Sequence, residues 1–128
     1  MKNLSKNEER EKWKEEFALR LVNFSVEVLK FSDILRKNPT LWPVCDQVIR
    51  SSTSVGANIN EAKGAGTKKD FAHYFQIALK SAKETQYWLV VIKHYDKPHA
   101  DRAEQLLEEM KEITRIINSS LLTMKGKK

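Results

Sequence analysis

Apolar residues recur every three or four positions along most of this chain, and this spacing restricts the folds that it can adopt. In the first third of the chain they step by four, three, four, three and four positions, the repeat of one buried helix face, at Phe17, Leu21, Phe24, Val28, Phe31 and Leu35. The 128 residues include only four Gly and three Pro, whereas an all-β domain has turn residues every ~8 to 12 positions. The chain is therefore predicted to be all-α.

Continuing the same reading along the chain predicts four helices, at about residues 7–37, 41–63, 68–95 and 99–124, and a basic C-terminal tail at 125–128. Short loops make consecutive helices antiparallel, so the expected architecture is an up-down-up-down four-helix bundle. A chain of 128 residues has the usual length of one domain. Residues 1–128 are therefore predicted to form a single bundle.

The expected helix boundaries rest on residues that stop and start helices. Asn38-Pro39 should end the first helix, because proline disfavours the α conformation in the residue before it. The second helix should end at Gly64 to Gly66, where glycine is expected to take the left-handed cap conformation. Thr67 is expected to cap the third helix, with the acid Asp70 three residues later.

The sequence gives no sign of export or of membrane insertion. Residues 1–16 are too charged to contain the apolar centre of a signal peptide. No run approaches the ~18 apolar residues that span a bilayer, and the single Cys45 has no partner for an internal disulfide. We therefore expect a cytoplasmic protein that makes no contact with a membrane.

The formal net charge of +6 is unevenly distributed. Residues 64–95 contain five Lys or Arg against two Asp or Glu, whereas residues 5–37 contain eight against seven. In the predicted third helix one face carries Lys69, His73, Gln76, Lys80, Lys83 and Tyr87. A basic face that ends in an aromatic residue is suited to phosphates, and the tail would add Lys125, Lys127 and Lys128. The alternative is an ordinary solvated helix face.

Residues 51–60, SSTSVGANIN, carry no charge although they lie inside a predicted helix. Small side chains let neighbouring backbones approach, so this helix is expected to be buried on more than one side. Gly56 costs about 1 kcal/mol relative to Ala in a helix interior, which indicates a close neighbour. Polar residues around the segment are expected to form a structural polar core between the second and third helices, or else to bind a ligand: Arg50, Asn58, Glu61 and Glu84.

No catalytic or metal site is expected from the reactive side chains. His73, His94 and His99 lack the spacing of metal ligands. Cys45 is expected to be a small buried apolar residue, because no neighbour in sequence would activate its thiol. The turn at residues 64–69 lacks the spacing and the preceding strand of a phosphate loop. We therefore expect neither enzymatic activity nor a cofactor.

Two stretches resemble a known family. Residues 47–62, QVIRSSTSVGANINEA, and 71–89, FAHYFQIALKSAKETQYWL, resemble the bacterial four helix bundle family. It includes the 23S rRNA-intervening sequence proteins and is similar to the accessory variability determinants (Avd) of diversity-generating retroelements. The resemblance covers about residues 15–124 and implies a ring-shaped homopentamer without catalytic residues. In the retroelement branch, it implies a positively charged ring that binds reverse transcriptase and nucleic acid. The motif serves packing in both branches, so it does not select between them.

Two classes of function remain. The first is a non-catalytic, self-associating adaptor that binds RNA or DNA, a nucleic-acid enzyme such as a reverse transcriptase, or both, and the positive charge favours it. The second is a structural homo-oligomeric protein-interaction module that binds no nucleic acid. Either would bury surplus apolar residues between subunits, notably Trp13, Leu19, Trp42 and Val91.

Overall fold

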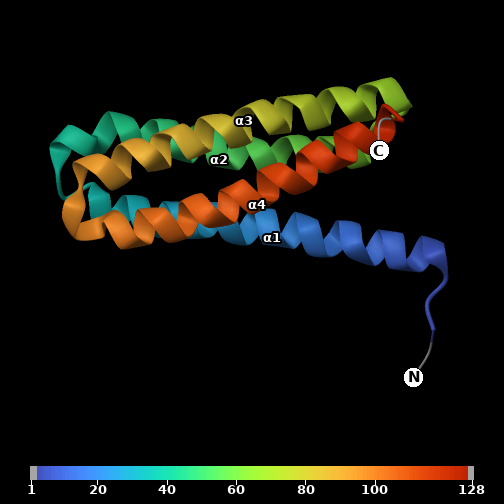
Figure 1. The fold of residues 1–128 in the computed structure, drawn as a ribbon, viewed down its shortest axis with the longest axis horizontal. Coiled ribbons are helices and arrows are strands. Elements are labelled where there is room, and N and C mark those ends of the chain that lie inside the picture. Colours follow the sequence, from blue (N-terminus) through green and yellow to red (C-terminus); the bar gives the residue numbers. More distant parts are fainter. Residues whose placement is uncertain (1–2, 127–128) are drawn as a thin grey trace.

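A computed structural model of the chain describes residues 3–126. They form α1 (Lys6–Leu35), α2 (Trp42–Lys63), α3 (Lys68–Tyr95) and α4 (Ala100–Met124), with short 3-10 helices at Pro39–Leu41 and Lys97–His99. Consecutive helices run antiparallel, so that α1 begins and α4 ends at the same end of the bundle (Figure 1). Within the described range the chain is all-α and adopts the predicted up-down-up-down arrangement.

The helix boundaries lie within two residues of the predicted positions. Thr67 caps α3 as expected, since its side-chain oxygen accepts a hydrogen bond of 3.1 Å from the Asp70 amide. α1 starts with a capping box that the apolar spacing does not reveal. In it the Glu8 amide donates to the Ser5 hydroxyl oxygen, and the Ser5 amide donates to the Glu8 carboxylate.

The predicted left-handed glycine at the end of α2 is wrong. Gly64 has a φ of −91°, and Gly126 is the only residue of the described range with a positive φ. The turn closes instead because the amides of Gly64 and Ala65 donate to the carbonyls of Glu61 and Ala62. These short-range bonds satisfy the last carbonyls of α2 without a left-handed residue.

The predicted apolar faces form the core. All six residues of the α1 series are buried, and α4 buries a matching series at Ala103, Leu106, Leu107, Met110, Ile113, Ile117 and Leu121. The buried apolar side chains of the four helices belong to one cluster. The helical period read from the sequence therefore identifies the side of each helix that faces its neighbours.

α2 packs against both α1 and α3, and its small residues make this possible. Toward α3, the Thr85 hydroxyl donates to the Ser51 hydroxyl oxygen at 2.9 Å, and the hydroxyls of Ser54 and Ser81 lie 2.9 Å apart. Toward α1, a Cβ placed on Gly56 would lie 3.4 Å from Leu21 Cβ. The predicted burial of α2 on two sides is confirmed, although Thr53, Ala57 and Asn60 face solvent.

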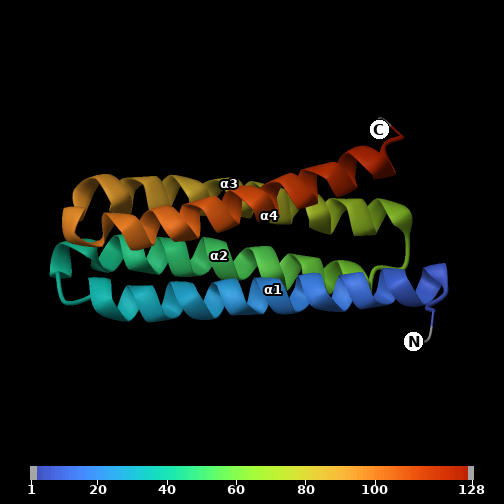
Figure 2. The same cartoon turned by 60° about the horizontal axis from the view of Figure 1, so that its bottom comes forward.

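α1 and α4 touch far less than the consecutive helices do. They lie nearest beside the α3–α4 turn and diverge toward the start of α1 and the end of α4 (Figures 1 and 2). Ion pairs join them: Arg20 donates to both Glu109 carboxylate oxygens at 2.7 and 2.8 Å, and Arg102 donates to Glu27 at 3.0 Å. Hydrogen bonding from Arg20 lowers the pKa of Glu109. Ion pairs therefore join α1 and α4 on the side of the α3–α4 turn, and the two helices separate toward the start of α1 and the end of α4 (Figure 2).

We expect Gly56→Leu to lower the free energy of unfolding by about 1 to 3 kcal/mol, because the larger side chain would collide with Leu21 and separate α1 from α2. Gly56→Ala is the matched control. Its methyl group only reaches van der Waals distance and removes the helix penalty of glycine, so its stability should stay within about 1 kcal/mol of wild type. Chemical denaturation followed by circular dichroism measures both, and an unchanged Gly56→Leu midpoint would contradict the close approach.

We expect the Arg20–Glu109 pair to stabilise the protein at neutral pH and to lose this effect in acid. The pKa of Glu109 is lower in the folded protein, so the stabilisation is present above the unfolded pKa of about 4.3 and disappears as pH falls through the folded value. Because solvent screens this partly exposed pair, Glu109→Gln should cost only about 0.5 to 1 kcal/mol at pH 7.

The measurement is the difference in unfolding free energy between wild type and Glu109→Gln from about pH 7 to pH 3, where it should shrink toward zero. Glu108→Gln is the control, since within residues 3–126 the one ion pair of Glu108 is with Lys111 on its own helix. A difference that is the same at both ends of the range would show that the charge of Glu109 contributes nothing.

Candidate functional site

The predicted basic face of α3 is exposed along its length, at Lys69, His73, Gln76, Lys80, Lys83 and Tyr87. α3 contains five lysines, and within residues 3–126 Lys93 alone forms an ion pair, with Glu104 at 2.8 Å. Lys69, Lys80 and Lys83 pair with no acid of the described chain, and neither does the neighbouring Lys68. These ammonium groups are therefore free to meet a phosphate without first breaking an internal ion pair.

Side-chain contacts hold the aromatic end of the basic face. Tyr87 is 61% exposed, and its ring packs edge-on against Trp88 with centroids 5.1 Å apart. The Trp88 indole N–H donates to the Glu84 carboxylate at 3.0 Å, and Arg50 of α2 pairs with the same carboxylate. The Tyr87 ring is therefore supported from behind and presents its other surface to solvent.

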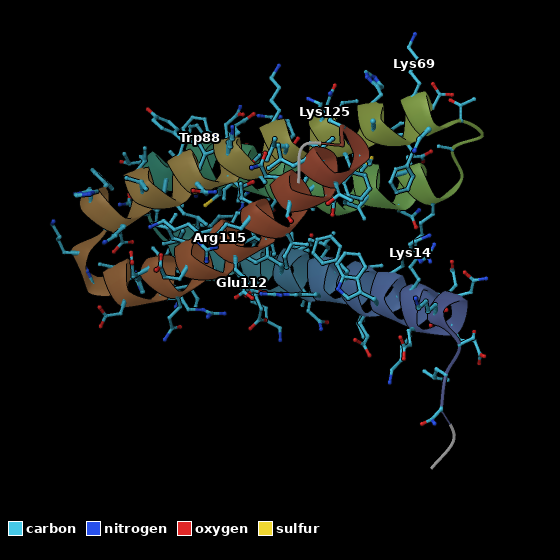
Figure 3. All side chains as sticks on the ribbon, turned by 45° about the vertical axis from the view of Figure 1, so that its right-hand side comes forward. Lys14, Lys69, Trp88, Glu112, Arg115 and Lys125 are labelled. Carbon is cyan, nitrogen blue, oxygen red and sulfur yellow. The ribbon has the colours of Figure 1, made fainter. Side chains whose placement is uncertain are left out.

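The basic tail is described only in part. Lys125 is exposed and follows α4 at the same end of the bundle as Lys69, which projects outward from α3 (Figure 3). Lys127 and Lys128 lie outside the described residues. The structure thus brings one predicted tail lysine to the end of the bundle where the basic face begins.

Of the four residues predicted as a polar core, Arg50 and Glu84 pair as expected, but the four do not form a buried set. Arg50 pairs with Glu84, but its side chain is 56% exposed. Asn58 donates to the Ser54 carbonyl at 2.8 Å, and Glu61 is exposed, with no hydrogen bond or ion pair to its carboxylate in residues 3–126.

The physical reason is the close approach of α2 and α3. The helices lie so near each other that short hydroxyl side chains, Ser51 and Thr85, fill the buried positions between them. Long charged side chains reach across from the rim, where water still solvates them. A polar pair was correctly expected between Arg50 and Glu84, but its depth depends on the distance between the two helices.

α1 has a second apolar face, which the predicted core series of this helix does not include. Leu19, Val22, Val26 and Leu29 are 59%, 56%, 40% and 45% exposed, and their spacing of three, four and three residues places them on one side of the helix. That side is opposite the buried face that contains Leu21 and Val28. We call these four residues the α1 apolar stripe. An exposed apolar stripe of this kind is a candidate interaction surface.

The other residues predicted between subunits have separate environments. Trp42 is half exposed, and its indole N–H donates to the Arg36 carbonyl at 2.7 Å, which fixes the turn between α1 and α2. Val91 is half-buried. Trp13 stacks on Phe17 with ring centroids 5.4 Å apart. Of the four predicted residues, Leu19 therefore belongs to the α1 apolar stripe.

The reactive side chains are scattered over the bundle. Cys45 is buried, and burial raises the pKa of its thiol. His99 lies 3.0 Å from the Asp96 carboxylate in the α3–α4 turn, whereas His73 is on the basic face. No group of three or more His, Cys, Asp or Glu side chains in residues 3–126 is arranged to hold a metal ion. In the same range, no helix has both the length and the apolar character needed to cross a membrane.

Comparison with known proteins places the chain in a family. The sequence model of the 23S rRNA-intervening sequence proteins matches residues 13–119. A crystal structure from Bacteroides thetaiotaomicron VPI-5482, of a protein of unknown function from the S23 ribosomal protein family, is similar with a TM-score of 0.76 and 30% identity. The similarity covers 82% of this chain and 97% of that chain. No curated protein sequence matches this chain significantly. The chain belongs to the 23S rRNA-intervening sequence protein family.

Proposed function

We propose that this protein is a non-catalytic, self-associating cytoplasmic adaptor that binds nucleic acid through the basic face of α3. The observation that carries the proposal is the set of α3 lysines that are exposed and form no ion pair in residues 3–126. Phosphate oxygens attract such ammonium groups without reading the base sequence. The supported ring of Tyr87 adds a surface on which an unpaired base can stack.

RNA is the first nucleic acid to consider. The family is named for intervening sequences of 23S rRNA, and the similar crystal structure comes from a family named for a ribosomal protein. An aromatic ring at the end of a basic face also suits single-stranded or looped RNA, whose bases are free to stack. In the adaptor that we propose, a nucleic-acid enzyme such as a reverse transcriptase would bind the same assembly.

Self-association would turn a weak site into a strong one. Three lysines on one subunit make few phosphate contacts, but repeated copies of the face on one assembly raise the effective concentration, and avidity can exceed single-site affinity by ~10² to 10⁴. The α1 apolar stripe supports such an assembly, because it offers an apolar surface on the outside of the subunit. The family resemblance suggests five subunits.

The same stripe also supports a second candidate function, a structural homo-oligomer that interacts only with proteins. In that case the lysines of α3 would keep the assembly soluble and would bind no nucleic acid. The two candidates share the assembly and differ in what the basic face does. A direct test of nucleic-acid binding therefore separates them.

We expect wild-type protein to bind RNA with an affinity that falls steeply with salt, by a log-log slope of about 0.7 per phosphate contact on single strands. The triple variant Lys69→Ala, Lys80→Ala and Lys83→Ala should lose about 2 units of that slope. The matched control replaces Lys6, Lys37 and Lys97, which are exposed and without an ion pair in the described range. This control variant removes the same number of positive charges outside the basic face. Its RNA affinity should therefore keep more of the wild-type salt dependence.

The measurement is fluorescence anisotropy of labelled RNA and DNA at several salt concentrations. If both triple variants lose the same slope, the binding follows net charge and not the basic face. If neither nucleic acid binds wild type at low salt, the second candidate function is the correct one.

We expect sedimentation to show an assembly larger than the 14.9 kDa monomer at micromolar concentration. Leu19→Glu combined with Val22→Glu should shift the protein toward the monomer, since burying two carboxylates in an apolar interface is unfavourable. Val90→Glu is the control, because Val90 is an exposed apolar residue on α3. A wild-type protein that sediments as a monomer would remove self-association from the proposal.

A further inference from the structure

The divergence of α1 and α4 leaves an apolar groove at the end of the bundle where α1 begins and α4 ends. It has a volume of about 750 Å³, and its main apolar lining consists of Trp13, Phe17, Phe71, Phe75, Ile116 and Met124. Figure 3 shows Lys14 on α1 and Glu112 and Arg115 on α4, and all three line the groove. The groove therefore takes side chains from all four helices, since Ile59 and Lys63 of α2 also line it.

The floor of the groove is built from stacked rings. Phe71 and Phe75 stack with centroids 4.8 Å apart and an interplanar angle of 27°, and Trp13 and Phe17 stack with an angle of 15°. In each pair one ring, Phe17 or Phe75, is buried. The other ring is at least partly exposed: Trp13 is 46% exposed and Phe71 is half-buried. The aromatic surface is thus supported from below and open above, as in a binding site that is formed before its ligand arrives.

The rim of the groove is positive. Its cations are Arg10, Lys14, Lys63 and Arg115, and of these only Lys14 has an acidic partner in residues 3–126, Glu11 at 3.4 Å. The single rim acid, Glu112, already lies 3.1 Å from Arg20. An incoming ligand therefore meets an apolar floor between cations that are free to pair with carboxylates.

From this complementarity we infer that the groove binds an amphipathic helix of a partner protein, with its apolar face on the aromatic floor and acidic residues against the rim. Apolar anchors at positions i, i+3, i+4 and i+7 suit a groove between two diverging helices. The inference deepens the proposed function and rests on it, because it describes how the adaptor would hold its protein partner.

Nucleic acid fits the groove less well than a helix does. The hydroxyls of Ser120 and Thr123 on the α4 side donate to carbonyls of their own helix, at 3.0 Å each. A nucleobase on this apolar floor would bury polar edges without partners, which is costly. Leucine or phenylalanine side chains of an amphipathic helix carry no such groups, so the observations favour a protein partner.

The test measures the anisotropy of a fluorescein-labelled helical peptide of about 18 residues, long enough for about five turns, with leucines on one face and glutamates on both sides of them. The comparison peptide carries lysine in place of each glutamate. We expect the acidic peptide to bind wild-type protein, and the Lys63→Glu and Arg115→Glu double variant to weaken this binding about tenfold or more. The matched charge control, Lys80→Glu with Lys83→Glu on the basic face, should stay within about twofold.

A second pair of variants tests the floor. Trp13→Ala should weaken peptide binding by about tenfold or more, whereas Trp42→Ala removes an indole of similar exposure outside the groove and should have little effect. Circular dichroism confirms that each variant is folded. Binding of the lysine peptide as tightly as the acidic one, or no binding of the acidic peptide, overturns the inference.

Two further outcomes assign the groove to a different occupant and also overturn the inference. If RNA displaces the peptide and loses affinity in Trp13→Ala, the groove is a nucleic-acid site. If Trp13→Ala dissociates the assembly in sedimentation, the groove is occupied by a second copy of the chain. Failure of the proposed function is separate, because the RNA salt titration depends on the lysines of α3 and the peptide measurement needs no RNA.

Discussion

The close packing of α2 between α1 and α3 is the constraint on which the rest of the bundle depends. At Gly56, α1 lies so close to α2 that a Cβ would be 3.4 Å from Leu21 Cβ. On the other side of α2, a hydrogen bond between the hydroxyls of Thr85 and Ser51 joins it to α3. These three helices form a layer in which α2 contacts α1 on one side and α3 on the other. α4 joins the layer mainly through α3, and the Arg20 and Arg102 ion pairs also link it to α1.

The three candidate surfaces follow from this arrangement. The outer side of α3 has no helix over it, so its lysines remain solvated and unpaired within the described chain. The outer side of α1 likewise has no neighbour, although Leu19, Val22, Val26 and Leu29 are apolar there. The groove lies where α1 and α4 diverge, toward the start of α1 and the end of α4 (Figure 2). Since the surfaces differ in chemistry and in place, the function that we propose would let one subunit make nucleic-acid, subunit and protein contacts separately.

Local signals predict the parts of the structure that depend on local interactions. The three- and four-residue spacing identified the core, and Thr67 with Asp70 marked the start of α3, because a cap is formed between residues three positions apart. The glycines after α2 led to a wrong prediction of a left-handed cap, because the last carbonyls of a helix can be satisfied in more than one way. Here amides fill this role without a left-handed residue, since each donates to the carbonyl three residues before it. The α1 apolar stripe carries a readable signal, a second helical series out of phase with the first, but the series does not say which face is buried.

The sequence by itself therefore determined the helices, their order and the face that each turns to the core, because hydrogen bonds and apolar periodicity act along one segment of chain. It also placed Lys69, Lys80 and Lys83 on one face of α3. Only the tertiary structure decided which polar residues are buried: the space between α2 and α3 admits Ser51 and Thr85 and keeps Arg50 at the rim. Only it decided that Trp13 and Phe71, far apart in the chain, line one groove. Distances between helices depend on the packing of all four at once, and no single segment contains that information.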